Sequence, residues 1–404
     1  MVGDIAPAVL AQIPDNTWVT DTEPLFSPSR RLPLVWGIAA LAASAMVILG
    51  VLWWHKTRSG DGGQAAKFAV HDTASLAATT EEVMQALEWL ASSQEDDGSW
   101  APEKWAGHPS YKTGISGLAL LAFLGSGQHP ENSRFAANIA RGLSYLLTQQ
   151  AADGRFGPAF SGASYNHGIA TLALIEAYAV TGDERFRGAI GKAVDFITSS
   201  QGKEGAWGYF RSGGPPNTSI TVWQLQALLL ADSLGWPEAG PSADAGLAWL
   251  AGTVDAEGRA GYRRQGDFPY GIRNLSAMAA FCLLMAEGGQ GGSVAGAAER
   301  LAQALAERPD DVDYCHSYFL SHALQAASVL KSPGRRSGGV SAELDRFLLQ
   351  HQLKAGPFSG SWEPTDQWGS AGGRIYSTAM AALSLEAAHR TRRLMAWTGG
   401  GTEQ

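Results

Sequence analysis

The densest group of reactive side chains in this sequence lies between Pro309 and Phe319. It contains two carboxylates, Asp311 and Asp313, followed by a thiol and an imidazole, Cys315 and His316. Carboxyl groups can exchange protons with a substrate, and carboxylate, thiolate and imidazole groups bind zinc. Zinc sites usually have three or four protein ligands, so Asp313 and Cys315 alone are too few. The structural alternative is that Asp311 or Asp313 caps a helix and Cys315 belongs to the core.

Polar and aromatic side chains also stand near the starts of six apolar segments that we expect to be helices. The amino end of a helix carries partial positive charge and unpaired N–H groups, so a ligand would find polar partners there. Helix capping explains a Thr, Ser or Asn at such a position, but His167 and Arg273 are not favoured caps. The candidate ligand-binding residues are therefore Tyr111, His167, Trp223, Arg273, His316 and Tyr376.

A sequence motif recurs about every fifty residues along the chain after Thr80. Each copy has an aromatic or apolar run, then a Gln (Val254 in the fourth, worn copy), and then a Gly followed in most copies by an aromatic ring. The last two marker glycines are 102 residues apart, about twice the usual step, so one unit has lost its marker near Pro309. The period indicates a repeat protein of six units. The markers are Gly98, Gly154, Gly205, Gly258 and Gly360.

Two helices are predicted in each unit. The helix before the marker is amphipathic, and the Gln at its end can donate to the unpaired carbonyls of its last turn. The helix after the marker is apolar all round and therefore buried on every side. Six pairs make a closed double ring or an open solenoid, and the absence of polar end units favours closure. Inner helices are expected to start near Lys112, Asn166, Asn217, Arg273, Tyr314 and Ser377, with Trp100, Trp207 and Trp362 at unit boundaries.

The copy that runs from Lys192 through Gln201 and Gly205 to Trp207 resembles the Gln-Trp repeat of squalene–hopene cyclases and protein prenyltransferase β subunits. The resemblance covers roughly residues 80–393 and implies the fold of that superfamily, the all-α α6/α6 toroid. It agrees with the double ring of six helix pairs that the repeat predicts.

The catalytic motifs of both families are incomplete in this chain. The cyclases carry Asp-x-Asp-Asp, and here Tyr314 replaces the last Asp; a phenol with a pKa of about 10 cannot protonate an alkene. The prenyltransferases carry Asp-x-Cys and a later Tyr-His-Thr as zinc ligands, and here Ser377 replaces that His. We therefore expect neither activity and predict no cofactor. Asp311 and Asp313 are the weak candidates for catalysis, and Asp313 and Cys315 those for zinc.

Glycosidases and polysaccharide lyases also use double rings of helices, with paired carboxylates facing the cavity. The apolar segments of this chain contain almost no carboxylates, since Glu176 and Glu386 lie toward their carboxyl ends. Five others lie in loops near the expected mouth of the ring, so a glycan-acting enzyme is an open alternative. These five are Asp267, Asp311, Asp313, Glu363 and Asp366.

Residues 32–54 carry no charge and are long enough to cross a bilayer as one helix. The sequence thus predicts a disordered tail over 1–31, a transmembrane helix over 32–54, a linker over 55–79, the toroid over 80–395 and a tail over 396–404. A cleaved signal peptide is the alternative for the apolar run. We expect a single-pass membrane protein whose partner is the lipid bilayer, with the side of the membrane left open.

The formal charge of −8 argues against nucleic acid as a partner, and two cysteines exclude a disulfide framework. The main functional hypothesis is a toroid that binds an apolar, isoprenoid-like small molecule in its central cavity. The alternatives are a non-enzymatic scaffold for protein partners and a glycan-acting enzyme. A deep cavity lined by Trp223 and His167 would favour the first, and an interior filled by its own side chains would favour the scaffold.

The membrane helix can be tested on the purified protein. If Leu32 to Trp54 is an uncleaved anchor, the protein should need detergent for extraction, and its amino terminus should include residues before Arg30. Membrane fractionation with mass spectrometry of the intact protein measures both. Soluble protein that begins near Ala45 would show that the run is a signal peptide instead.

Overall fold

The computed structural model describes residues 80–209, 214–269, 272–286, 313–330 and 337–399. In these ranges the regular elements are helices, and extended pairing is limited to three isolated bridges, as between Gln352 and Trp362. The predicted tail, membrane helix and linker lie outside these ranges, as do Asp311 and the unit near Pro309. None of the described helices is both long enough and apolar enough to cross a membrane.

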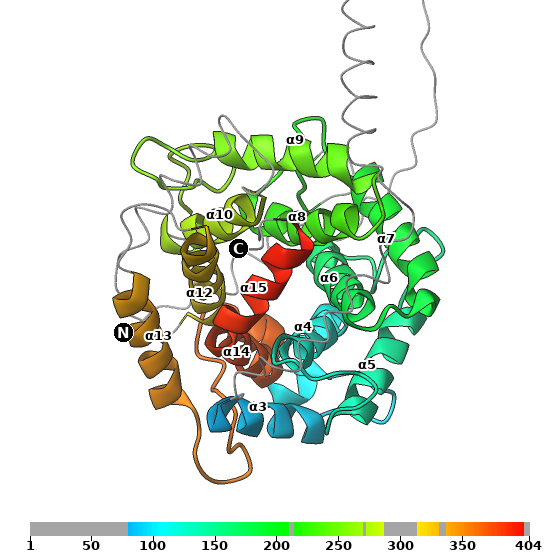
Figure 1. The fold of residues 1–404 in the computed structure, drawn as a ribbon, viewed down its shortest axis with the longest axis vertical. Helices are drawn as coiled ribbons and strands as arrows, with labels where there is room; N and C mark the ends of the chain where they lie inside the picture. Colours follow the sequence, from blue (N-terminus) through cyan, green and yellow to red (C-terminus); the bar gives the residue numbers. More distant parts are fainter. Residues whose placement is uncertain (1–79, 210–213, 270–271, 287–312, 331–336, 400–404) are drawn as a thin grey trace, which may run out of the picture. The chain divides into compact units, whose positions relative to one another are not determined.

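The described helices of the repeat region form two concentric layers (Figure 1). The inner helices are α4 (Lys112–Gly125), α6 (Ala163–Thr181), α8 (Thr218–Ser233), α10 (Ile272–Ala286), α12 (Tyr314–Val329) and α14 (Gly369–Leu385). The outer helices are α3 (Glu81–Ser92), α5 (Ala136–Thr148), α7 (Arg187–Ser199), α9 (Ala239–Gly252) and α13 (Ser337–His351). Short 3-10 turns lie at η2 (Pro102–Trp105), η3 (Pro109–Tyr111) and η4 (Glu184–Phe186).

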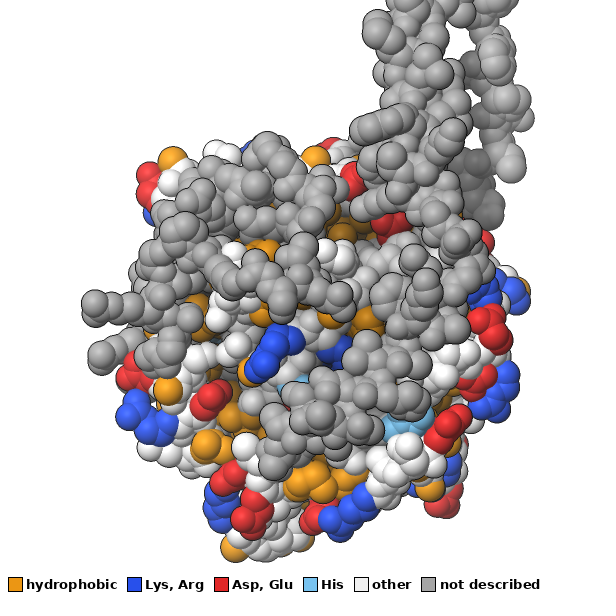
Figure 2. All heavy atoms as spheres, in the orientation of Figure 1, with side chains coloured by type: hydrophobic (Ala, Val, Ile, Leu, Met, Phe, Trp, Pro, Cys, Tyr) orange, Lys and Arg blue, Asp and Glu red, His pale blue; other side chains and the backbone are white. Residues whose placement is uncertain are grey.

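The ring is closed, as predicted. Each inner helix packs against the next one along the chain, and α14, the last, packs against α4, the first. Charged side chains of both signs lie interspersed around the outer helices (Figure 2), which agrees with their amphipathic sequences. The predicted starts of α4 and α12 are correct and those of α8 and α10 are within one residue. Helix α6 starts three residues earlier than predicted, and α14 is interrupted at Gly373, where φ is 63°.

In four of the described units a glutamine joins the unit to the next, and the unit with marker Gly258 has Val254 at this position. The side-chain amide of Gln94 donates to the carbonyl of its own marker, Gly98, and to the carbonyl of Asn138 in α5, both at 2.9 Å. Both acceptors lie outside the last turn of α3, where the sequence analysis had placed the acceptor. Two further units repeat the pair of bonds, with Gln150 on Gly154 and Ala189, and Gln201 on Gly205 and Ser242.

The same bond closes the ring between its last and first units. The amide of Gln352 donates to the carbonyl of Gly360 at 3.0 Å and to that of Glu82 in α3 at 2.8 Å, across 270 residues of sequence. The marker glycine fits against the backbone of the neighbouring outer helix. At Gly360, φ is 89°, and a Cβ there would lie 2.4 Å from the carbonyl oxygen of Gln85. Only glycine accommodates both the left-handed backbone and this close approach.

The three tryptophans that follow marker glycines lie at the unit boundaries, as predicted. The indole N–H of Trp100 donates to the carbonyl of Leu90 at 2.7 Å, and its ring lies where a Cβ on Gly142 of the next outer helix would be 2.9 Å away. Trp207 repeats this arrangement with Gly246. Trp362 is fully buried and donates to Leu348 at 2.8 Å. Each indole thus fills the space beside the glutamine bridge.

A further helix that the repeat does not predict, α15 (Ala387–Trp397), lies across the opening enclosed by the inner helices (Figure 1). Arg393 of α15 donates to the carbonyl of Leu124 at the end of α4 at 2.7 Å. Thr398, just after α15, lies 3.4 Å from the carbonyl of Met285 at the end of α10. Helix α15 therefore covers the end of the ring at which the inner helices finish.

Beneath α15 the interior holds a buried polar cluster. The guanidinium of Arg390 forms an ion pair with Glu176, and neither side chain is exposed to solvent. Arg390 also donates to the hydroxyl of Tyr318 and to Nε2 of His322, each at 3.0 Å. Burial and the neighbouring arginine lower the pKa of His322 well below its usual value, so its ring is neutral and its Nδ1–H donates to the Tyr318 carbonyl. The cluster fixes α15 to α6 and α12.

Ring closure can be tested by replacing Gly360 with Ala. The change adds a Cβ at positive φ and places it against the carbonyl of Gln85, so the free energy of unfolding should fall. Gly356→Ala is the matched control, because Gly356 also has positive φ (79°) but a Cβ there meets nothing within 4 Å. Urea unfolding should show a loss for Gly360→Ala that exceeds the control by about 1–3 kcal/mol. Equal losses of stability in the two variants would contradict the close approach of Gly360 to Gln85, where the last unit meets the first.

Candidate functional site

The amino ends of the inner helices form the opposite end of the ring, and two carboxylates lie side by side there. Asp313 precedes α12, and its Oδ1 accepts from the backbone N–H of His316 at 2.8 Å, which caps that helix. Asp366 precedes α14, and its Oδ1 accepts from the N–H of Trp368 at 3.1 Å, which fixes the turn into the helix. Adjacent inner helices therefore bring together two aspartates that are 53 residues apart in the sequence.

Hydrogen bonds interlock the two aspartates. The backbone N–H of Tyr314, next to Asp313, donates to Oδ2 of Asp366 at 3.0 Å. In return, the amide of Gln367, next to Asp366, donates to Oδ2 of Asp313 at 3.3 Å. The Asn274 amide also donates to that oxygen, at 2.5 Å. Asp313 thus accepts a backbone donor at Oδ1 and two side-chain donors at Oδ2.

The environment of Asp366 differs, because that side chain is largely enclosed. Burial, together with the nearby charge of Asp313, raises the pKa of Asp366 to about 6. The hydroxyl of Tyr376 donates to Oδ2 of Asp366 at 3.0 Å, which partly opposes this rise. Burial also raises the pKa of Tyr376 well above 10, so its phenol keeps the proton that it donates. Two neighbouring carboxyl groups in such different surroundings can divide the roles of proton donor and proton acceptor.

Hydroxyl groups line the same end of the ring at α6 and α8. The Tyr165 hydroxyl lies 2.7 Å from that of Ser219, which in turn donates to Asn217 at 2.9 Å. The Tyr262 hydroxyl donates to that of Tyr209 at 3.3 Å. Two cations of this end are already paired, since Lys112 lies 3.1 Å from Glu103 and Arg374 lies 2.7 Å from Glu363. The described surroundings of the acid pair are therefore polar rather than strongly charged.

His167 does not line the mouth of the ring as the sequence analysis predicted. Its Nδ1 accepts from the backbone N–H of Phe156 at 3.0 Å, and its Nε2 lies 3.2 Å from the carbonyl of Ala193 in α7. The ring packs against Phe156 and Phe196, and burial lowers its pKa to about 3. His167 thus lies between the two layers, where other units use a hydroxyl such as Ser116 on Trp100.

Trp223 is also not a cavity wall. It stacks on Tyr318 at a ring distance of 5.7 Å and packs edge-on against Phe319 at 5.4 Å. Phe281 lies against the same two rings, at 6.2 and 6.3 Å. The ring interior at this level is therefore filled by the protein's own aromatic side chains. This packing does not support the predicted apolar ligand.

The other candidates lie near the mouth or outside the described side chains. Tyr376 joins the acid pair, and His316 is buried in the first turn of α12. Tyr111 is half-buried directly before α4, and its ring packs edge-on against Phe160 at 5.1 Å. The side chain of Arg273 lies outside the described residues. Their binding roles remain predictions.

The two zinc candidates, Asp313 and Cys315, have roles in the packing of α12. Asp313 caps α12, and Cys315 is buried, as the structural alternative proposed. Burial and the two aspartates raise the pKa of Cys315 well above its usual value, which opposes the thiolate that zinc requires. Ser377, in place of the expected histidine, donates to the Trp362 carbonyl at 2.7 Å. Among the residues that the structure describes, His, Cys, Asp and Glu side chains form no group of three that could hold a metal ion.

Sequence comparison gives one distant relative. No family model matches the chain. The squalene–hopene cyclase of Bradyrhizobium diazoefficiens is 25% identical over an alignment of 199 residues. The match covers 42% of this chain and 28% of that protein. The match thus spans under a third of the relative's length. It supports the α/α toroid and leaves membership of the cyclase family unproven.

Comparison of structures gives neighbours with the same fold. An alpha-1,6-mannanase of a Salegentibacter species has a TM-score of 0.58 at 11% identity, with 76% of this chain and 98% of the neighbour covered. A D-mannose isomerase has a TM-score of 0.57 at 15% identity, with 81% and 99% covered. The cellobiose 2-epimerase of Bacillus thermoamylovorans has a TM-score of 0.57 at 11% identity, with 76% and 98% covered. Identities this low establish the toroid fold alone.

The raised pKa of Asp366 has a measurable consequence for stability. The folded state holds this proton up to about pH 6, whereas the unfolded chain releases it near 3.8, the ordinary pKa of an aspartate. The free energy of unfolding should therefore fall as pH rises between these values. Asp366→Asn should lack this contribution, so it should raise the melting temperature more at pH 8 than at pH 4. Asp345→Asn is the positive control and should show the same dependence on pH, because burial also raises the pKa of Asp345 to about 6 away from the acid pair. A shift for Asp366→Asn that does not change with pH would contradict the assignment.

Proposed function

We propose that this chain acts on a neutral glycan at the amino end of its ring, with Asp366 as proton donor and Asp313 as the second carboxylate. The observation that carries the proposal is the interlocked acid pair, in which two carboxyl groups from the starts of adjacent inner helices lie together and one of them, Asp366, is largely enclosed with a pKa of about 6. Cleavage of a glycosidic bond needs two carboxyl groups in different protonation states.

The proposed chemistry begins with protonated Asp366. It transfers its proton to the oxygen of the leaving sugar as the bond from that oxygen to the anomeric carbon breaks. Asp313 stabilises the positive charge that develops on the sugar ring. A water molecule then forms the new bond to the anomeric carbon and gives a proton to the Asp366 carboxylate, which restores the acid. Tyr376 orients Asp366 through its hydrogen bond. Each of these groups lies at the end of the ring that α15 leaves uncovered.

The fold neighbours agree with a glycan as the substrate class. The mannanase, the isomerase and the epimerase are each named for a carbohydrate, and each shares the double ring. Lys112 is paired with Glu103 and Arg374 with Glu363, so these two cations of the described side chains are already engaged and do not favour an acidic sugar or a diphosphate. A neutral, hydroxyl-rich substrate fits this end of the ring better than either.

A protein-binding scaffold is the second candidate, and the filled interior favours it. The stacked rings of Trp223 and Tyr318 and the buried Arg390 occupy the space in which a cavity-bound ligand would lie. A scaffold needs no acid pair, however, so it does not explain the raised pKa of Asp366. The two candidate functions differ in whether Asp313 and Asp366 are required for activity.

The activity test measures the release of reducing ends from α-1,6-mannan, starch, xylan and soluble cellulose derivatives by the purified full chain. At least one substrate should be cleaved, with kcat/KM falling as pH rises above about 6 because Asp366 loses its proton. Asp366→Asn and Asp313→Asn should each lower kcat/KM by about 10²–10⁴-fold. Asp267→Asn, which removes a loop carboxylate outside the pair, should change it by less than about twofold. Failure to cleave any of these glycans, or full activity in both variants, would contradict the proposal and favour the scaffold.

A further inference from the structure

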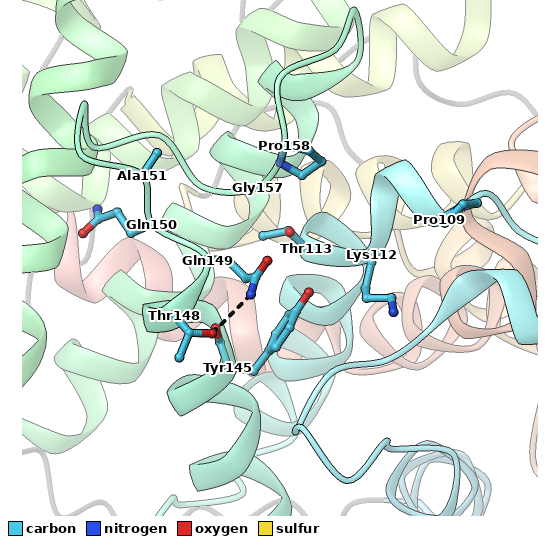
Figure 3. Close-up of a pocket in the computed structure, with 10 residues that line it drawn as sticks. All are labelled: Pro109, Lys112, Thr113, Tyr145, Thr148, Gln149, Gln150, Ala151, Gly157 and Pro158. Carbon is cyan, nitrogen blue, oxygen red and sulfur yellow. Dashed lines mark hydrogen bonds between the residues drawn. The ribbon is translucent and has the colours of Figure 1, made fainter.

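A cavity of about 450 Å³ lies between the start of α4 and the end of α5 (Figure 3). Its walls combine the rings of Pro109 and Pro158 with polar groups from Thr113, Tyr145 and Gln149. A few polar groups set among apolar walls are typical of small-molecule sites, whose volumes run from about 300 to 1,000 Å³. None of these residues belongs to the acid pair.

This cavity opens at the same end of the ring as the acid pair. Thr113 lies in the first turn of α4, and Asp366 immediately precedes α14, which packs against α4. Tyr145 lies in the last turn of α5, which runs antiparallel to α4 and so ends where α4 begins. A chain of sugars that reaches Asp366 therefore has a second site one repeat unit away.

The hydroxyl of Tyr145 is not a requirement of the repeat. Five residues before the bridging glutamine, or before Val254 in the unit that lacks one, five described units have an aromatic ring, and the rings of Trp89, Tyr145 and Phe196 are buried. The other units use Trp89, Phe196, Trp249 and Phe347. Only at Tyr145, among these five, does the ring carry a hydroxyl, and that hydroxyl lines the cavity. The repeat accounts for the ring, whereas the hydroxyl occurs in this unit alone among the five and lies within hydrogen-bonding reach of Thr113 at the cavity wall.

The polar groups of the cavity suit an uncharged ligand with several hydroxyls. Burial raises the pKa of Tyr145 to about 12, so its phenol stays neutral and can both donate and accept. In Figure 3 the Tyr145 hydroxyl points toward Thr113 and Lys112, and Gln149 lies beside it, 3.2 Å from the Thr148 hydroxyl. The charge of Lys112 is matched by Glu103 at 3.1 Å. The Tyr145 hydroxyl and the Gln149 amide can form hydrogen bonds with the hydroxyl groups of a neutral sugar, and the paired charge of Lys112 does not favour an anion.

We propose that this cavity binds a sugar residue of a neutral glycan at a distance from the bond that is broken. The inference rests on the proposed function for the choice of ligand class, but it assigns a separate site with its own residues. The Tyr145 hydroxyl and the Gln149 amide bind the sugar, and Pro109 and Pro158 contact its apolar face. Long glycans gain affinity from this site, and short ones do not.

The test measures binding by isothermal titration calorimetry to the full chain carrying Asp366→Asn, so that no probe is consumed. The probes are cellohexaose, maltohexaose and α-1,6-linked mannohexaose, each compared with its disaccharide. At least one hexasaccharide should bind, and adding Tyr145→Phe or Gln149→Ala should weaken it by about tenfold, as expected for the loss of one hydrogen bond. The disaccharide should change by less than twofold.

Two features of the design keep a folding defect from imitating the result. Tyr145→Phe installs the residue that the next unit carries at Phe196, so the melting temperature should stay within a few degrees of the parent. Ser200→Ala changes the position in that next unit that corresponds to Gln149, and hexasaccharide affinity should not change.

The outcomes separate this inference from the proposed function. A hexasaccharide that binds equally well to the parent and to Tyr145→Phe overturns the inference, even if the enzyme is active. Tyr145-dependent binding without cleavage by the unsubstituted chain supports the cavity and contradicts the hydrolase. Binding of glucuronate oligosaccharides in preference to neutral ones, weakened by salt, would assign the cavity to an anion and overturn the choice of ligand. If none of the probes binds, the inference is wrong.

Discussion

One type of contact, the side-chain amide of a glutamine, recurs around the ring and holds four of the described units to their neighbours. The glutamine amide bridges the carbonyl of its own marker glycine and a carbonyl of the next outer helix, so it satisfies two backbone acceptors on both sides of a seam. The glycine must be a glycine, because the neighbouring carbonyl occupies the space of a Cβ. The inner helices are apolar on every side, and only a closed ring keeps all six of them from water.

Closure makes the two ends of the ring different. Helix α15 lies across the carboxyl ends of the inner helices and is fixed there by the buried pair of Arg390 and Glu176. Removal of one partner from such a pair typically costs about 3–5 kcal/mol, because the other charge stays buried alone. The amino ends carry loops, unpaired N–H groups and the acid pair. Chemistry at this end needs no opening of the core, since Asp313 and Asp366 lie in the loops before α12 and α14.

Features that recur could be predicted from the sequence, and features that occur once could not. Period and apolar pattern predicted four of the six inner helix starts to within one residue, the closed ring and the boundary positions of Trp100 and Trp207, whereas α14 starts eight residues before the predicted Ser377. Helix α15 was not predicted because it follows the sixth helix pair and has no counterpart in the other units, although Arg390 is wholly buried by partners far away in sequence. His167 was misplaced because a buried histidine can replace a hydroxyl between the layers. Asp366 was noted only as a loop carboxylate, since its partner Tyr376 is recognisable only once α14 is in place.

The central claim is that ligands meet this protein at the amino ends of the inner helices and not beneath α15. Hydrogen–deuterium exchange of the full chain, with and without the neutral hexasaccharides, tests it most directly. The account predicts slower exchange in the loops and first turns around 105–113, 313–318 and 363–376, with no change over 390–398. Protection concentrated in α15 and the carboxyl ends of the inner helices, with none at Asp313 or Asp366, would contradict it.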